Sequence, residues 1–261
     1  MTKQKIETKK VSVPALERAS RLLDLVATQH EPLALSDAAR SLDLAKSSVH
    51  SLYQSLTELG LLERSGTGVV IGSKAVAWAH AFLNRSDLAS EFVQFWNTLN
   101  EPCNETVTLT ILDGQDVIYV ASQAGIDPIS INFKIGMRLP AIFTATGKAI
   151  LSTLPSNTLQ QDYANGLPAP LTPYSVNTLP SLQAELAFVR ERGFSIDKQQ
   201  VRSNLVCLGA PIYSFSSGTQ AVGGIALSIQ ATSLDEHTKN ELSEKVMRYA
   251  QGLSQRLGAN K

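Results

Sequence analysis

Apolar residues recur at helical spacing in three successive segments near the start of the chain. The first segment begins at Pro14 and places on one face Leu16, Ala19, Leu22, Leu23 and Val26. A shorter segment follows the polar residues Ser36 and Asp37, which are typical of a helix start, and its apolar residues are Ala38, Ala39 and Leu42. The third begins at Lys46, with an apolar face of Val49, Leu52, Leu56 and Leu59. The spacing predicts a support helix followed by a helix-turn-helix pair.

Two short β-prone runs follow the third predicted helix. Gly60 is suited to the helix C-terminal cap, and the runs LLER and VVI are joined by a tip that contains Gly66, Thr67 and Gly68. Two strands with a glycine-rich tip after such a helix pair form a wing. Residues 13–72 therefore predict a winged helix-turn-helix, a unit that binds DNA, and the wing makes an ordinary helical hairpin the weaker interpretation.

The polar face of the third predicted helix supplies the candidate DNA contacts. Its N-terminal end can enter the major groove, where we expect base contacts from Ser47, Ser48, Ser51 and Gln54. Lys46 and His50 are expected on phosphates, and Arg64 and Thr67 would touch the backbone or the minor groove from the wing. The expected macromolecular partner is double-stranded operator DNA.

Residues 73–100 predict two helical stretches with a break at 84–87. The first stretch is apolar nearly all round, with Ala75, Val76, Ala77, Trp78, Ala79, Ala81, Phe82 and Leu83. A helix of this kind must be covered on most sides, and a connector between two domains has little around it to provide cover. We therefore expect it to pack against the same helix of a second subunit, which gives a homodimer.

The pattern changes again in residues 101–261. TVTLTIL and QDVIYVAS flank the turn pair Asp113 and Gly114 and predict a β-hairpin. ISINFK, FSID, LVCLGAPIY and AVGGIALSIQ predict further strands, and helices are expected near 144–147, over SLQAELAFVRERG and at the C-terminus. This order predicts an α+β domain with a mainly antiparallel sheet, which can bind a small molecule between the sheet and its loops.

Composition narrows the functional classes. The 261 residues predict about two domains, and 23 basic against 23 acidic residues exclude a protein that binds nucleic acid everywhere by charge. Residues 1–12 are locally basic and would suit an arm near phosphates. No apolar run reaches the roughly 20 residues that span a bilayer, so we expect a cytoplasmic protein with no membrane partner.

Catalysis, cofactors and metals are not indicated. Cys103 and Cys207 are too few for a disulfide framework or a zinc-ligand spacing, and the four histidines form no metal motif. The sequence lacks GxSxG, HExxH, P-loop and GxGxxG motifs. Cys207 beside Asp197 could form a reactive pair, but a cysteine inside the apolar run LVCLGAP is more often a core residue.

Six segments together resemble the IclR family of bacterial transcription regulators: LERASRLLDLVA, LSDAARSLDLAKSSVHSLYQSLTELGLLER, ETVTLTILDGQDVIYVAS, GMRLP with TATGKAIL, LQAELAFVRERGFSID and LVCLGAPI. The resemblance implies an N-terminal winged helix-turn-helix, a helical linker that dimerises, and a C-terminal effector-binding domain of GAF-like topology. It also implies a small organic-acid effector and assembly as a dimer, or as a tetramer of two dimers.

The resemblance further implies the effector-binding residues. Backbone N–H groups of Ala145 and Thr146 would face a carboxylate, with Asp197, Cys207 and Ser228 as polar neighbours. The apolar side would consist of Ile131, Leu139 and Leu205, with Phe143 narrowing the pocket. Gln230 replaces a serine that is frequent in the family. Two alternatives remain: a C-terminal domain that only oligomerises or responds to redox state through Cys207, and an enzyme on the same scaffold.

Overall fold

The computed structural model describes residues 12–83, 88–99, 102–125 and 133–259. The chain divides into two compact units, Met1–Phe82 and Leu83–Lys261. Each unit has its own hydrophobic core, so each is described by itself. Among the described residues, no helix combines the length and the hydrophobicity that a membrane span requires.

The N-terminal unit contains the predicted helices and wing. Its elements are α1 (Pro14–Ala27), β1 (Leu33–Ala34), α2 (Leu35–Leu42), α3 (Lys46–Glu58), β2 (Leu62–Ser65), β3 (Gly68–Ile71) and α4 (Lys74–Leu83). The strands form an antiparallel sheet in the order β1-β3-β2. Apolar faces of α1, α2 and α3 meet over this sheet in a core that includes Leu22, Ala38, Val49, Leu56 and Val69.

Two details of this unit differ from the sequence pattern. Leu59 was expected to face the core but is 55% exposed, because it is the C-cap of α3, where the chain turns through Gly60 at a φ of 74°. Tyr53 is buried instead, and its hydroxyl donates a 3.0 Å hydrogen bond to the carbonyl of Leu33. Leu16, at the start of α1, also lies outside the core and is 64% exposed.

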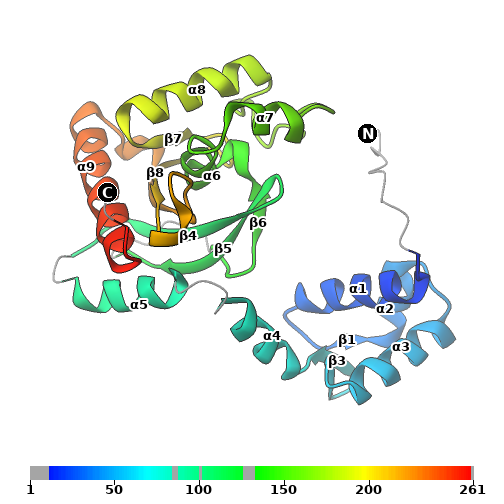
Figure 1. The fold of residues 1–261 in the computed structure, drawn as a ribbon. Helices are drawn as coiled ribbons and strands as arrows, with labels where there is room; N and C mark the ends of the chain where they lie inside the picture. The colour runs from blue at the N-terminus through cyan, green and yellow to red at the C-terminus, as the bar shows by residue number, and fades with distance from the viewer. Residues whose placement is uncertain (1–11, 84–87, 100–101, 126–132, 260–261) are drawn as a thin grey trace. The chain divides into compact units, whose positions relative to one another are not determined.

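The C-terminal unit is the predicted α+β domain (Figure 1). Its helices are α5 (Leu88–Thr98), α6 (Ala145–Leu151), α7 (Ser156–Asp162), α8 (Leu179–Arg192) and α9 (Glu236–Arg256). Short 3-10 turns occur at η1 (Ala141–Phe143), η2 (Phe215–Ser217) and η3 (Ala231–Ser233). The strands are β4 (Thr106–Asp113), β5 (Asp116–Gln123), β6 (Arg138–Pro140), β7 (Ser195–Lys198), β8 (Leu205–Ile212) and β9 (Gly223–Gln230).

A six-stranded antiparallel sheet organises this domain in the order β6-β5-β4-β9-β8-β7. The predicted hairpin is confirmed, with Asp113 opposite Asp116. The strand predicted over ISINFK falls mainly on residues outside the described ranges, and its last two residues, Phe133 and Lys134, are not in a strand. The short elements β6 and α7 were not predicted.

Helices cover both faces of the sheet and create two cores. One core packs α5 and α9 against the sheet, and the other packs η1, α6, α7 and α8 against the opposite face (Figure 1). Strand β8 alternates between them: Val206 and Leu208 belong to the first core, and Leu205 and Cys207 to the second. Strand β7 is left as one edge of the sheet.

Candidate functional sites

The predicted recognition surface on α3 is accessible to solvent. Lys46, Ser47, His50, Ser51 and Gln54 are exposed. Ser48 is half-buried at the first turn. The Ser51 hydroxyl donates to the carbonyl of Ser47 at 3.1 Å, and the Gln54 amide donates to Glu58 at 3.2 Å. The wing therefore leaves the serine-rich tip uncovered within this unit, as a DNA contact requires.

A cleft of about 140 Å³ separates α3 from the wing. His50 lines it from the helix, and Arg64 and Thr67 line it from the wing. Gly66 at the wing tip has a φ of 56°, a backbone conformation that glycine adopts easily. The structure thus brings together three of the four residues that were predicted to touch the DNA backbone, and Lys46 does not line this cleft.

A small closed cavity lies between the start of α6 and the sheet of the C-terminal domain. Its lining consists of Thr108, Tyr119, Phe133, Thr144, Ala145, Thr146, Asp197, Val201, Leu205, Cys207, Ala226 and Ser228. Two glycines permit the close approach of helix and sheet, since a Cβ on Gly209 or Gly224 would lie within 2.8 Å of the Ala145 or Thr146 backbone. The cavity volume is about 10 Å³, close to the minimum for one water molecule.

The structure gathers six of the ten predicted effector residues around this cavity: Ala145, Thr146, Asp197, Leu205, Cys207 and Ser228. Three others are placed elsewhere. Leu139 is half-buried in β6, Phe143 is a fully buried core residue of η1, and Gln230 is exposed at the end of β9. Ile131 lies outside the described residues.

Sequence reasoning missed six lining residues of the cavity: Thr108, Tyr119, Phe133, Thr144, Val201 and Ala226. A signal existed for Thr108, because Thr106, Thr108 and Thr110 alternate with apolar residues and so share one face of β4. Tyr119 comes from the neighbouring strand β5. Its approach to the cavity depends on strand pairing, which one sequence does not reveal.

Asp197 is the central polar group of the cavity. Its side chain is 1% exposed, and Oδ1 accepts the backbone N–H of Gln200 at 2.6 Å. Within the described part of the chain, Asp197 Oδ2 and Thr146 Oγ1 are buried without a hydrogen-bond partner. Burial raises the pKa of Asp197 to about 7, and the positive charge of Lys148 opposes this rise. Two oxygens without hydrogen-bond partners thus belong to residues that line a cavity with room for about one water molecule.

The Cys207 thiol is shielded from solvent. It is 7% exposed and accepts a 3.1 Å hydrogen bond from the Ser228 hydroxyl. Burial raises the pKa of this thiol, and the charge of Asp197 raises it further. Cys103 is also buried, and burial raises its pKa to about 11. Neither cysteine is therefore an accessible thiolate near neutral pH.

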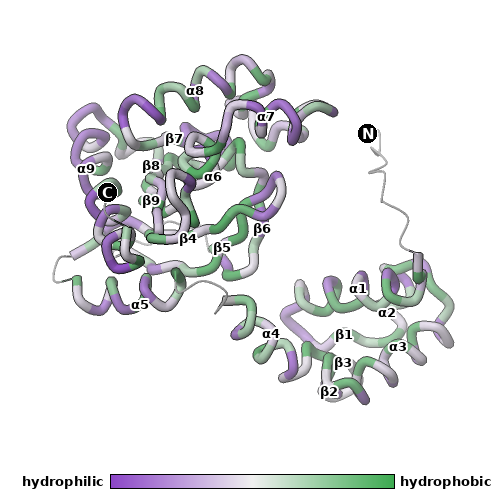
Figure 2. Tube along the Cα trace, in the orientation of Figure 1, coloured by the Kyte–Doolittle hydropathy of each residue, from purple (hydrophilic) through white to green (hydrophobic). Residues whose placement is uncertain are grey.

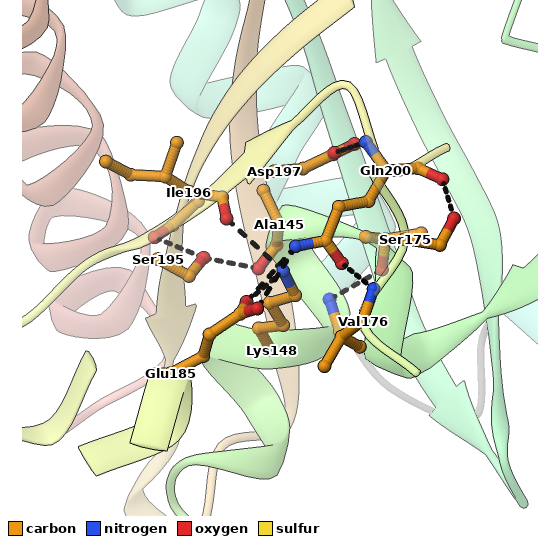
Figure 3. Close-up of polar contacts among 12 residues, drawn as sticks. Ala145, Lys148, Ser175, Val176, Glu185, Ser195, Ile196, Asp197 and Gln200 are labelled. Atoms are coloured by element: carbon orange, nitrogen blue, oxygen red, sulfur yellow. Dashed lines mark hydrogen bonds and ion pairs between the residues drawn. The ribbon is translucent and has the colours of Figure 1, made fainter. Parts of the chain in front are cut away.

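A polar network connects Asp197 to an ion pair between buried Lys148 and half-buried Glu185 (Figure 3). Lys148 is 1% exposed, pairs with Glu185 from α8, and donates to the carbonyl of Ile196 at 3.4 Å. The Gln200 amide donates to both oxygens of Glu185 at 3.2 and 3.3 Å, while the Gln200 backbone N–H binds Asp197. The sequence analysis did not identify Lys148, Glu185 or Gln200 as site residues.

The linker helix α4 presents large apolar side chains to solvent in the single chain. Val76 is 71% exposed, Trp78 53% and Phe82 38%. Figure 2 shows this helix as hydrophobic over most of its length. Lys74 Nζ lies 5.7 Å from the centre of the Trp78 ring, which covers only one side of that residue.

Known proteins match both units. The family profile "IclR helix-turn-helix domain" matches residues 15–66, and "Bacterial transcriptional regulator IclR C-terminal" matches residues 80–255. The crystal structure of the Agobacterium tumefaciens repressor BlcR is 40% identical, covers 96% of this chain and 99% of its own, and superposes with a TM-score of 0.63.

Two further relatives cover nearly the whole chain. The transcriptional regulator XynR of Escherichia coli K12 is 26% identical over 94% of this chain and 98% of its own length. An IclR homologue from Microbacterium hydrocarbonoxydans, crystallised with 4-hydroxybenzoate, is 19% identical over 94% and 100%, with a TM-score of 0.78, and it supports the fold alone. The chain is therefore a DNA-binding transcription regulator that belongs to the IclR family.

Proposed function

We propose that the C-terminal domain binds a small organic acid in the cavity beside α6 and thereby changes the affinity of the N-terminal unit for operator DNA. The observation that carries the proposal is the pair of buried oxygens without partners, Asp197 Oδ2 and Thr146 Oγ1. Such groups cost free energy unless a ligand or water satisfies them. A ligand with a hydroxyl group near Asp197 and a polar group near Thr146 would satisfy both.

Ligand entry requires the cavity to widen, because about 10 Å³ holds no organic acid. The ligand would therefore select an arrangement of α6 and the strands beneath it that is more open than the one in this structure. Differential affinity for two such states corresponds to a coupling free energy of about 1 to 3 kcal/mol between effector and operator. The Microbacterium homologue was crystallised with 4-hydroxybenzoate, a carboxylate, so that compound is among the acids to try.

On the DNA side, Ser47, Ser48, Ser51 and Gln54 are the proposed base-reading residues. Lys46, His50, Arg64 and Thr67 are the proposed backbone contacts. All of these residues except the half-buried Ser48 are exposed on α3 and the wing, which supports these roles. Serine hydroxyls donate and accept and so discriminate weakly between bases, and specificity would then also depend on half-site spacing and DNA shape.

A second subunit is proposed to cover α4. Exposed Val76, Trp78 and Phe82 form an apolar surface that suits an identical helix in a homodimer. A dimer presents two recognition helices to successive major-groove faces. Pairing of two dimers into a tetramer is a further possibility of the same arrangement.

The redox alternative receives no support from the site. An accessible thiolate would favour it, whereas Cys207 is buried, hydrogen-bonded to Ser228 and held in the thiol form by burial. The metabolite-responsive function is therefore the one that we propose.

A screen of organic acids tests the effector role. We expect one or more acids, with 4-hydroxybenzoate among those tried, to raise the melting temperature of the intact chain and to shift its operator affinity by about fivefold or more. Thr146→Val should weaken both effects together, whereas Thr153→Val, on a threonine that does not line the cavity, should leave them unchanged. Ligand binding that survives Thr146→Val and Asp197→Asn intact would contradict the proposed site.

A further inference from the structure

A second pocket of about 230 Å³ opens at the free edge of the sheet, beside β7. It is bounded by α8, by β7 and by the start of α9, and it is distinct from the cavity under α6 because Ile196 and Lys198 line it while Asp197 lines the cavity. Successive residues of a strand point to opposite faces, which explains the division.

The lining of this outer pocket is strongly basic. Four of its side chains are cationic, namely Lys148, Arg192, Lys198 and Lys239, and Glu185 is the one carboxylate among the lining residues. Glu185 is already paired with Lys148 at the base of the pocket. Lys239 pairs with Glu236 at 2.9 Å. Arg192 and Lys198 form no salt bridge with the described residues, although Glu185 interacts electrostatically with Arg192 and Glu236 with Lys198 over a longer distance.

Arg192 is held in a fixed orientation. Its Nε donates to the carbonyl of Phe194 at 2.7 Å, and its guanidinium lies 4.6 Å from the centre of the Phe194 ring. Both contacts leave the two terminal amino groups without a hydrogen bond to the described residues. A guanidinium fixed in this way offers a planar pair of donors that matches a carboxylate or a phosphate.

We propose that this outer pocket binds a small dianion through Arg192 and Lys198. The chemistry is that of two carboxylates or of one phosphate group, because a monoanion would leave one of the two cations unpaired. The volume suits a ligand smaller than the drug-sized molecules that occupy 300–1,000 Å³ sites. The 60% exposed Phe188 supplies an apolar wall beside the charged groups.

An anion in the outer pocket would change the electrostatic environment of Asp197 in the inner cavity. Lys148 lies on α6, one turn after the cavity residues Ala145 and Thr146, and Gln200 contacts both Glu185 and Asp197 (Figure 3). Negative charge added beside Lys148 offsets its attraction for the Asp197 carboxylate. The outer pocket is thus a regulatory site whose ligand modulates the inner one, and its existence does not depend on the identity of the inner ligand.

Calorimetric titration of the intact chain with succinate and with inorganic phosphate, at constant ionic strength and without DNA, tests the proposal. We expect saturable binding of at least one dianion with one site per chain, and no saturation with acetate. Arg192→Gln and Lys198→Gln should each weaken binding about tenfold, the loss of one charge-assisted contact. Lys198 is exposed at the end of β7, so its substitution leaves the fold intact.

Arg202→Gln is the matched control, since Arg202 is exposed in the same domain but does not line the pocket. It should bind the dianion as the unsubstituted chain does. Equal weakening by Arg202→Gln would reveal only a nonspecific charge effect and would overturn the proposal. Binding that survives both pocket substitutions would place the anion elsewhere, and lack of saturable binding by either dianion would exclude the site.

Discussion

At the scale of single residues, the properties of the C-terminal site follow from burial. Asp197 lies in a volume that holds about one water, and its charged form has only the Gln200 and Val201 backbone N–H groups and the more distant Lys148 to stabilise it. Its pKa therefore rises to about 7. Near neutral pH the carboxyl group exists in both forms, so it can either donate to a ligand carboxylate or accept from a ligand hydroxyl.

Replacing Asp197 with Asn should remove a pH dependence of stability. The pKa of Asp197 is raised on folding from about 3.8 to about 7, so its contribution to stability is fully present below pH 4 and is lost as the pH rises to 7. The lost free energy of unfolding is on the order of 4 kcal/mol. Urea denaturation that follows the unfolding of the C-terminal unit measures this effect. Between pH 5 and 8, the free energy of unfolding of Asp197→Asn should rise relative to that of the unsubstituted chain. A difference that does not change with pH would contradict the assignment.

Lys46 and Ser51 should affect DNA binding in different ways. Lys46→Ala removes a phosphate contact, so affinity should fall for all duplexes and the slope of log K against log salt should decrease by about one. Ser51→Ala should leave the slope unchanged and relax the preference between operator variants. Fluorescence anisotropy at several salt concentrations measures both quantities. An unchanged slope in Lys46→Ala would show that Lys46 does not contact phosphate.

At the scale of elements, the local pattern predicts the helices well. The 3.6-residue spacing located α1, α2, α3, α8 and α9, and the Asp113–Gly114 turn located the β4–β5 hairpin. β1 and β6 were missed because each is two or three residues long and exists only through pairing with a distant strand. Pairing between strands that are distant in the sequence leaves no periodic pattern of apolar residues, so a single sequence does not reveal it.

The same limit applies to the cavity beside α6. Six of its residues could be predicted because the TATGKA, FSID, LVCLGAPI and ALSIQ segments carry them. Phe143 does not line the cavity because its side chain is buried in the core at η1, and Gln230 does not because it lies at the exposed end of β9, opposite Leu205. Their effector contacts stay predictions. Tyr119 and Thr108 could not be identified as cavity residues without knowing which strands lie beneath α6.

Tyr53 should be the residue of α3 whose hydroxyl stabilises the wing. Its hydrogen bond to the carbonyl of Leu33 connects α3 to β1. Tyr53→Phe leaves that buried carbonyl with one fewer donor and should lower the free energy of unfolding of the N-terminal unit by about 1 kcal/mol. Thermal unfolding measures the change. Tyr174→Phe, at a 59% exposed position, is the control and should have no effect, and equal effects would contradict the role of Tyr53.

At the scale of the whole molecule, the apolar helix α4 is the proposed contact between two subunits. Trp78→Glu places a charge on the surface proposed to face the partner subunit, and burial of that charge would oppose pairing. Sedimentation equilibrium should show a shift from dimer to monomer, together with weaker operator binding. Phe215→Glu, at the 82% exposed position of η2, should leave the assembly unchanged. A Trp78→Glu dimer as stable as the original would exclude α4 as the interface.

The proposed regulation requires both units, because the cavity lies in one and α3 in the other. The most direct test first selects, from a random pool, the DNA duplexes that the intact chain retains. The chain is then titrated into the most enriched duplex, with and without an acid that raises the melting temperature of the chain, and the two affinities are compared. We predict an enriched inverted repeat whose affinity changes by about fivefold or more when the acid is present. Enrichment of no sequence, or an affinity that saturating acid leaves unchanged, would contradict a ligand-responsive regulator.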